Sequence, residues 1–238
     1  VDLSKCYGGS ASIQQDPHDE TNYALAMNRT SAETNMSMVK YKFNPYNADN
    51  AKALIIDADV MAGDDLAGDK IWQTFYIGQS GTEVHVYKLY RAGKQLIGRG
   101  GDIVVDGTVM QDVTLTRTFT KGDWHHIQVA LDLVNQRVTH VYFDGELVQQ
   151  DVPFRNTVEN INSVFSFTQD NTQGTTWMDN FQVTAIGYYD GLTERDAKNI
   201  DLGDTTALIS DIELPTTGTI NGSEIAWTSS NEALIAPD

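Results

Sequence analysis

The stretch that decides the fold is Ile127-Gln128-Val129-Ala130-Leu131-Asp132-Leu133, where a large apolar residue stands at every second position. Alternate side chains of an extended chain point to the same face, so this stretch predicts a strand with one face in a core. Asn135-Gln136 and then Asp144-Gly145 interrupt the residues that follow. Asp-Gly between apolar segments is a strong signal of a tight hairpin, because both residues tolerate a positive φ. We therefore expect antiparallel strands over 127–133, 137–143 and 146–149.

Short alternating segments of the same kind recur along most of the chain, and helical periodicity is scarce. Gly, Asn and Asp separate these segments, as turn residues do. Further strands are expected over 38–43, 53–61, 71–77, 83–91, 113–119, 163–168 and 177–186. This number of short strands predicts an all-β protein built as an antiparallel two-sheet β-sandwich.

Two motifs point to a family. The first joins Gly122-Asp123-Trp124-His125-His126, at the start of the deciding strand, to Val141-Tyr142-Phe143-Asp144-Gly145. The second is Trp177-Met178-Asp179-Asn180-Phe181-Gln182-Val183, followed by Gly187-Tyr188-Tyr189 and an expected helix that ends at Ile200. These motifs resemble the hairpin and the final strand of laminin-G-like, concanavalin-A-like jelly rolls. The resemblance covers roughly residues 35–200 and implies a jelly-roll domain over residues 1–203.

The last 35 residues differ in character, being rich in Ser, Thr and small residues. Leu214-Pro215-Thr216-Thr217-Gly218 and then Ile225-Ala226-Trp227 are similar to the opening half of a bacterial immunoglobulin-like repeat. We expect a truncated segment of that kind over residues 204–238, with a hairpin at Asn221-Gly222. Such repeats accompany jelly rolls in large secreted carbohydrate-active enzymes of bacteria. The resemblance therefore implies a non-catalytic carbohydrate-binding module, tethered to a catalytic domain in a secreted or cell-surface bacterial protein, with a polysaccharide or glycoconjugate as its partner.

Composition excludes several classes of partner and site. The 238 residues carry 16 Lys and Arg against 33 Asp and Glu, a formal net charge of −17. No basic stripe is visible, so nucleic acid is not an expected partner. No apolar run is long enough for a membrane-spanning helix, so no membrane insertion is expected. Cys6 is the single cysteine, which excludes an internal disulfide and a cysteine-based zinc site.

Sugar binding is expected to depend on aromatic side chains, since the C–H faces of sugars lie against aromatic rings. Trp72 and Tyr76 stand at positions of equal parity in the strand over 71–77, and Tyr87 of the next strand could extend their face. Trp177 follows Gly174-Thr175-Thr176 and could lie at a rim. The alternative is that Trp72 packs under a loop or in a core layer.

Carboxylates suggest a structural calcium site. Asp57 and Asp59 begin an acidic stretch, and calcium prefers carboxylate and carbonyl oxygens. The alternative is a solvated acidic loop. Asp179 has the same parity as the apolar Trp177 and Phe181, and it would bind either calcium or backbone amides. Asp57 and Asp59 have the parity opposite to Ile56 and its apolar partners. Joining them to Asp179 therefore requires a strand end or a bulge.

Catalysis is not expected. Retaining jelly-roll glycosidases need two carboxylates about 5 Å apart on one strand face, and only Asp57-Ala58-Asp59 is similar to that pattern. The Arg-rich strand and the Gln-x-His and Tyr motifs of lyase-type jelly rolls are not found. Two alternatives to the binding module stay open: a structural or adhesin spacer, and a divergent jelly-roll glycosidase or lyase that uses Asp57 and Asp59.

Overall fold

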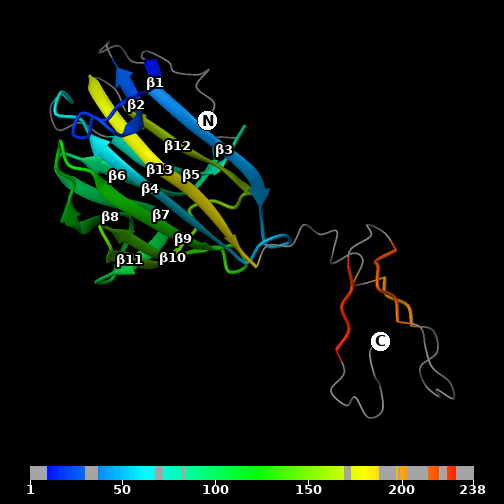
Figure 1. Ribbon diagram of the computed structural model, residues 1–238. Helices are drawn as coiled ribbons and strands as arrows, with labels where there is room; N and C mark the ends of the chain where they lie inside the picture. The colour runs from blue at the N-terminus through cyan, green and yellow to red at the C-terminus, as the bar shows by residue number, and fades with distance from the viewer. Residues whose placement is uncertain are drawn as a thin grey trace. The chain divides into compact units, whose positions relative to one another are not determined.

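The computed structural model describes residues 10–29, 37–67, 72–81, 84–168, 173–187, 197, 199–202, 214–219 and 224–228. Its described strands form two antiparallel sheets that stack as a sandwich (Figure 1). The seven-stranded sheet has the order β1 (Ser10–Gln15), β2 (Tyr23–Arg29), β13 (Gly174–Ile186), β4 (Ala53–Ala62), β9 (His125–Asp132), β10 (Arg137–Phe143), β11 (Glu146–Pro153). The six-stranded sheet has the order β3 (Ser37–Tyr46), β12 (Ile161–Thr168), β5 (Trp72–Gln79), β6 (Val84–Ala92), β7 (Gln95–Val105), β8 (Thr108–Thr118). The prediction of an all-β jelly-roll sandwich is confirmed.

The core lies between the two sheets and is built from alternate residues of each strand. Ile127, Val129 and Leu131 of β9 are fully buried, as their spacing predicts, and they pack in one cluster with apolar residues of both sheets. Ile56 of β4 pairs with Val129 of β9, so the central strands of the seven-stranded sheet share one apolar face. Burial of this face is the main stabilising contribution to the fold.

Two β-bulges shift the parity of strands that the sequence pattern treats as regular. In β5 the register with β6 changes between Gln73 and Phe75, which makes Thr74 the extra residue. In β13 the register with β4 changes between Asp179 and Gln182, and Asn180 has a φ of 49°. An extra residue on one strand sends the following side chains to the opposite face. Both bulges therefore decide which side chains reach the surface.

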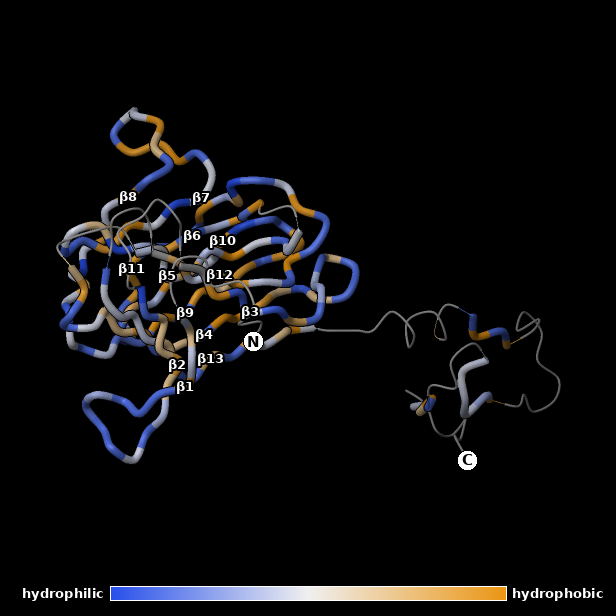
Figure 2. The backbone as a smooth tube through the Cα atoms, turned by 90° about the horizontal axis from the view of Figure 1, so that it is seen from above, coloured by the Kyte–Doolittle hydropathy of each residue, from blue (hydrophilic) through white to orange (hydrophobic). Residues whose placement is uncertain are grey.

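The hairpin of β7 and β8 extends beyond the sandwich and has an apolar tip (Figure 2). Val104 is 70% exposed and Val109 is 62% exposed, and they pair with each other across the hairpin. Its turn at Asp106-Gly107 has two positive φ angles, as a tight two-residue hairpin requires. β8 is also the edge strand of its sheet. The hairpin thus presents apolar surface and an unpaired strand edge together.

Residues 187–238 form a second compact unit, separate from the unit of residues 1–186. Within its described residues, Ile225 N–H donates to the carbonyl of Thr216, and Trp227 Nε1 donates to the carbonyl of Pro215 at 2.7 Å. The immunoglobulin-like character of this segment and the domain boundary at residue 203 stay predictions. The helix expected to end at Ile200 and the turn at Asn221-Gly222 lie outside the described residues, apart from isolated positions. In the part of the chain that the structure describes, no helix has the length and apolarity needed to cross a membrane.

Candidate functional site

One row of paired residues crosses the whole six-stranded sheet and carries three basic side chains. Its members, in spatial order, are Lys40, Phe165, Tyr76, Lys88, Arg99 and Asp112. Phe75 and Ile77, the neighbours of Tyr76, are buried in the core, so the row lies on the outer face of the sheet. The Lys40 ammonium lies 4.4 Å from the centre of the Phe165 ring, and Tyr76 packs edge-on against the same ring. We call this row, together with His85 and Arg155, the basic face.

His85 lies beside this row and is surrounded by cations. Its ring is 4.2 Å from the ring of Tyr76, and its buried Nε2 atom has no hydrogen-bond partner among the described residues. Burial, together with the charges of Lys88, Arg155 and Arg99, lowers the pKa of His85 to about 4. The imidazole is therefore neutral at pH 7 and can accept a proton.

Lys88 and Arg99 carry the positive charge next to this imidazole. Burial, and secondarily the charge of Arg99, lowers the pKa of Lys88, and its ammonium lies 5.1 Å from the centre of the Tyr90 ring. Arg99 Nε lies 3.2 Å from an oxygen of Asp112, which also accepts a hydrogen bond from the Tyr90 hydroxyl at 3.0 Å. Arg99 is thus paired with a carboxylate that also interacts electrostatically with Lys88, and these two cations and one anion keep a net positive charge.

The segment after β11 brings Arg155 to the same place. Its N–H donates to the carbonyl of Val86 at 2.8 Å, beyond the point where β6 and β7 stop pairing. Its guanidinium donates to Gln111 Oε1, and Gln111 Nε2 donates to Asp102 at 2.7 Å. These bonds connect the basic face to the base of the β7–β8 hairpin. Lys88, Arg99 and Arg155 therefore place three cations around one neutral histidine, an arrangement that attracts an anionic ligand.

Two of the predicted sugar-binding aromatics are not at the surface. Trp72 is fully buried; its ring packs edge-on against Phe119 and its Nε1 donates to the Ser166 hydroxyl at 3.2 Å. The expectation that Trp72 and Tyr76 share a face was wrong, because the bulge at Thr74 places them on opposite faces.

Tyr87 also points into the core, where its hydroxyl donates to Gln149 Oε1 at 2.6 Å. The expectation that it extends an exposed patch was wrong, because alternation from Leu89 places Tyr87 inside. Tyr76, in contrast, lies on the outer face as part of the basic face.

Trp177 lies on the outer side of the seven-stranded sheet, in a small cluster with Ala24, Ala26 and Met61. It is 8% exposed and lines a pocket of about 240 Å³ together with His18 and Asp64. A role for Trp177 in ligand binding stays a prediction.

Asp57 and Asp59 project from the outer face of the seven-stranded sheet, as their parity predicts. Asp59 lies 2.8 Å from His126 Nδ1, and Asp57 accepts a hydrogen bond from Gln128 at 2.7 Å. The bulge in β13 brings Asp179 into register with Asp59.

Asp179 is half-buried rather than buried, and it accepts hydrogen bonds from Asn22 Nδ2 and from the backbone N–H of Asn180. Among the described residues, no group of three or more His, Cys, Asp or Glu side chains is arranged to hold a metal ion. Calcium binding by Asp57, Asp59 and Asp179 stays a prediction, which the melting temperature with and without a chelator would test.

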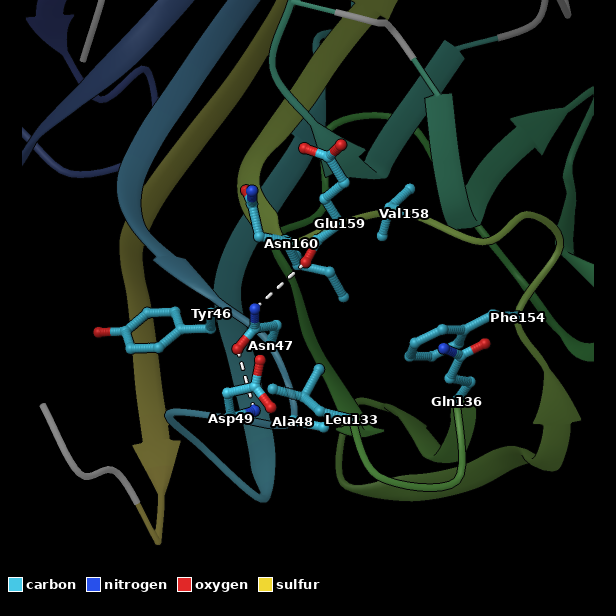
Figure 3. A pocket seen from close by; sticks show the side chains of 11 residues that line it. Tyr46, Asn47, Ala48, Asp49, Leu133, Gln136, Phe154, Val158, Glu159 and Asn160 are labelled. Atoms are coloured by element: carbon cyan, nitrogen blue, oxygen red, sulfur yellow. Dashed lines mark hydrogen bonds between the residues drawn. The ribbon is translucent and has the colours of Figure 1, made fainter. Parts of the chain in front are cut away.

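Another hollow, of about 180 Å³, opens at the end of the sandwich near the turn between β3 and β4 (Figure 3). Figure 3 shows Phe154 and Gln136 on one side, facing Asn47 and Leu133 on the other. In the part of the chain that the structure describes, its lining contains amides, carboxylates and apolar side chains but no Lys, Arg or His. It therefore lacks the positive charge that distinguishes the basic face.

The basic face was not predicted from the sequence. Lys88 and Tyr90 have equal parity on one strand, and Lys40 and Lys42 on another. These are the signals that could have shown a basic sheet face. Arg155 follows a strand that is distant in sequence, and only the fold brings it to His85.

No protein-family model and no curated protein sequence matches the chain. Solved structures match by shape. A sialidase is 13% identical with a TM-score of 0.57 over 76% of this chain, and the matched part spans 16% of that sialidase. A carbohydrate esterase of the Shiga toxin-encoding bacteriophage phi24B is 13% identical with a TM-score of 0.52, over 76% of this chain and 89% of its own. An endo-β-1,4-glucuronan lyase of the fungus Trichoderma reesei is 15% identical with a TM-score of 0.51, over 77% of this chain and 91% of its own.

These likenesses establish the fold, a jelly-roll sandwich of the kind found in carbohydrate-active enzymes. They also correct the functional expectation. The lyase and the esterase consist of little besides the matched region, and both are enzymes. The expectations of a non-catalytic carbohydrate-binding module and of a chain without enzymatic activity are therefore wrong.

Proposed function

We propose that this chain is a divergent jelly-roll polysaccharide lyase whose substrate is an acidic, uronate-containing polysaccharide. The observation that carries the proposal is the neutral His85 among Lys88, Arg99 and Arg155, on the outer face of a sheet in a chain of net charge −17. A polyanion binds to such a chain only where cations gather locally. The glucuronan lyase of similar fold acts, by its name, on a polymer of this charge.

The reaction is a β-elimination. A base removes the proton at C5, a C4–C5 double bond forms, the C4–O4 bond breaks, and O4 takes a proton. In this scheme Lys88, Arg99 and Arg155 bind the uronate carboxylate and stabilise the charge that develops on it. His85 takes the C5 proton, and the hydroxyl of Tyr76, whose ring packs against the His85 ring, donates a proton to O4. A bound carboxylate offsets the neighbouring positive charges, which raises the proton affinity of His85 when the substrate is present.

The test is product formation from polyuronates. The purified full chain is incubated with polyglucuronate, alginate and, as a neutral control, a β-glucan. The unsaturated product is measured by the ultraviolet absorbance of its conjugated double bond. We expect product from at least one polyuronate and none from the neutral glycan. Removal of the base in His85→Asn should lower the rate by about 10²–10⁴-fold.

Arg99→Gln and Arg137→Gln form a matched pair of variants. Both arginines lie next to an aspartate, but Arg137 is in β10, in the other sheet. Arg99→Gln should weaken polyuronate turnover, and Arg137→Gln should not. No unsaturated product from any polyuronate, or product that does not depend on His85 and Arg99, would contradict the proposal.

Two further features stay predictions: that the protein is secreted or lies on the cell surface of a bacterium, and that a longer protein tethers this chain to a catalytic domain. Fractionation of the source organism, with an antibody against the jelly roll, would test the location.

A further inference from the structure

We propose that Asp112, on the edge strand β8, is a positioning residue that holds the guanidinium of Arg99 in place for the substrate carboxylate. This inference rests on the proposed lyase function and adds to it a residue that acts through Arg99. The observation behind it is that an anion stands within the basic face. Asp112 ends the row that carries Lys40, Lys88 and Arg99, and a carboxylate there weakens the attraction for an anionic substrate. Its presence therefore needs a reason other than substrate binding.

Strand pairing places Asp112 directly beside Arg99. Lys88 of β6 pairs with Arg99 of β7, which pairs with Asp112 of β8. Directly opposite residues lie close enough for their side chains to interact, and Arg99 Nε is 3.2 Å from an oxygen of Asp112. The side chains of Arg99 and Asp112 are 28% and 41% exposed, and ion pairs that face solvent to this extent contribute little to stability. Stability thus does not explain the pair.

A second contact fixes the carboxylate itself. The Tyr90 hydroxyl donates to the same Asp112 oxygen at 3.0 Å, and Tyr90 is 9% exposed. Burial and then this hydrogen bond raise the pKa of Tyr90 to about 12, so the hydroxyl stays a donor across the neutral range. An arginine side chain without such a partner has many rotamers, and ordering them weakens ligand binding. Because Asp112 is anchored to a buried tyrosine, its charge attracts the Arg99 guanidinium to one place.

The contact leaves the two Nη groups of Arg99 for a ligand. Asp112 lies next to the Nε atom, which is buried, and the two residues form an ion pair without an aligned hydrogen bond. The Nη groups can together donate to both oxygens of one carboxylate. Held at its Nε side, Arg99 offers these donors in an orientation that is already set. Preorganised donors of this kind stabilise the charge that develops during a reaction.

The neighbouring residue of β8 contacts the second arginine. The guanidinium of Arg155 donates to Gln111 Oε1, and Gln111 Nε2 donates to Asp102 at 2.7 Å. A glycine allows this contact, because a Cβ at Gly100 of β7 would lie 2.8 Å from the carbonyl oxygen of Pro153. The segment before Arg155 can therefore pass directly against β7. Adjacent residues of one edge strand thus contact both arginines of the basic face, which supports a positioning role for β8.

Asp112→Asn separates positioning from a simple effect of charge. The amide keeps the size of the side chain and an oxygen for Tyr90, but it removes the negative charge. If Asp112 only weakened substrate binding, the variant would have a lower KM and an unchanged or higher kcat. If Asp112 holds Arg99, kcat falls although the site becomes more positive. We expect kcat to fall about 10- to 100-fold and KM not to rise, because a displacement of about 1 Å in a reacting group can cost about 10²-fold in rate.

The experiment measures kcat and KM of the full chain on polyglucuronate and alginate, for the wild type and three variants. Asp151→Asn is the matched control, because it removes the same charge from an aspartate that is paired with Arg137 in the other sheet, and it should leave kcat and KM unchanged. Asp112→Glu keeps the charge and should recover part of the kcat that Asp112→Asn loses. An unchanged or higher kcat in Asp112→Asn, or an equal fall in Asp151→Asn, would overturn the proposal.

A second measurement tests the contact without any substrate. The NMR order parameter of the Arg99 Nε–H bond, assigned by loss of its signal in Arg99→Gln, reports how tightly the guanidinium is held. It should lie near the value of about 0.85 for rigid groups in the wild type and in Asp151→Asn, and fall below about 0.6 in Asp112→Asn. If the wild type forms no unsaturated product from any polyuronate, the lyase proposal fails, and this order parameter still decides whether Asp112 holds Arg99. An order parameter that Asp112→Asn does not change would overturn the positioning role.

Discussion

His85 combines partial burial with three neighbouring cations, and both effects favour its neutral form. Because its pKa of about 4 in the folded chain lies below the ordinary value of 6.5, the unfolded chain binds more protons between these pH values. We predict that the His85 contribution to the free energy of unfolding is complete above about pH 6.5, falls as the pH drops toward about 4, and levels off below that.

Urea unfolding of the wild type and of His85→Asn across this pH range measures the effect. The difference in free energy between the two proteins should depend on pH in this window, whereas the difference between the wild type and Thr116→Ala, at an exposed position without a titratable side chain, should not. A pH-independent difference for His85→Asn would show that the imidazole is not held neutral by its surroundings.

Trp72 offers a second prediction at the scale of one side chain. It is fully buried, contacts Phe119 and donates to Ser166, so Trp72→Ala leaves a cavity and removes this hydrogen bond. We expect a loss of about 3–5 kcal/mol in the free energy of unfolding, measured by urea denaturation. Tyr23→Ala, at a side chain that is 61% exposed, should cost well under half as much. Comparable losses in the two variants would mean that Trp72 is not a core residue.

At the scale of the element, β7 passes very close to the opposite sheet. A Cβ at Gly98 would come 2.0 Å from Gln149 Oε1 and 2.5 Å from the Tyr87 hydroxyl. Gly98→Ala should therefore disturb the buried Tyr87–Gln149 hydrogen bond and lower the free energy of unfolding by about 1–3 kcal/mol. Thr116→Ala, at an exposed position of β8, is the control in the same denaturation experiment and should have little effect. An unchanged free energy of unfolding in Gly98→Ala would show that β7 can move away from β11.

The alternation of apolar and polar residues within single strands predicted most of the fold and little of the candidate site. Alternation predicts strands such as β9 and β4, because one of their faces is apolar throughout. Alternation did not predict β1 and β2, because the two faces of each strand do not differ clearly in polarity. It also did not predict the long β7, which contains several glycines. Parity fails after a bulge, which is why Trp72 was placed on the surface. Bulges depend on cross-strand pairing, which a single strand's pattern does not contain.

At the scale of the whole molecule, the charge distribution decides which ligands can approach. The chain repels anions on average, and within the described residues the basic face gathers cations from β3, β6, β7 and the segment after β11. Polyanion binding should therefore weaken steeply with added salt, because the attraction is local and screened. Binding of a fluorescent polyuronate to His85→Asn, which is catalytically impaired, measures this dependence. An affinity that does not change with salt would contradict electrostatic recognition.

The protruding β7–β8 hairpin has a consequence for handling the protein. Its valine tip and open strand edge favour association between molecules, whereas the net negative charge of each molecule makes the molecules repel one another. The Debye length shrinks from about 10 Å at 0.1 M salt to about 3 Å at 1 M, so concentrated salt should remove this colloidal protection. Light scattering should then detect clusters of molecules in 1 M salt. The double variant Val104→Lys, Val109→Lys should suppress them. A wild-type solution that is equally monodisperse at both salt concentrations would show that the hairpin tip does not cause association.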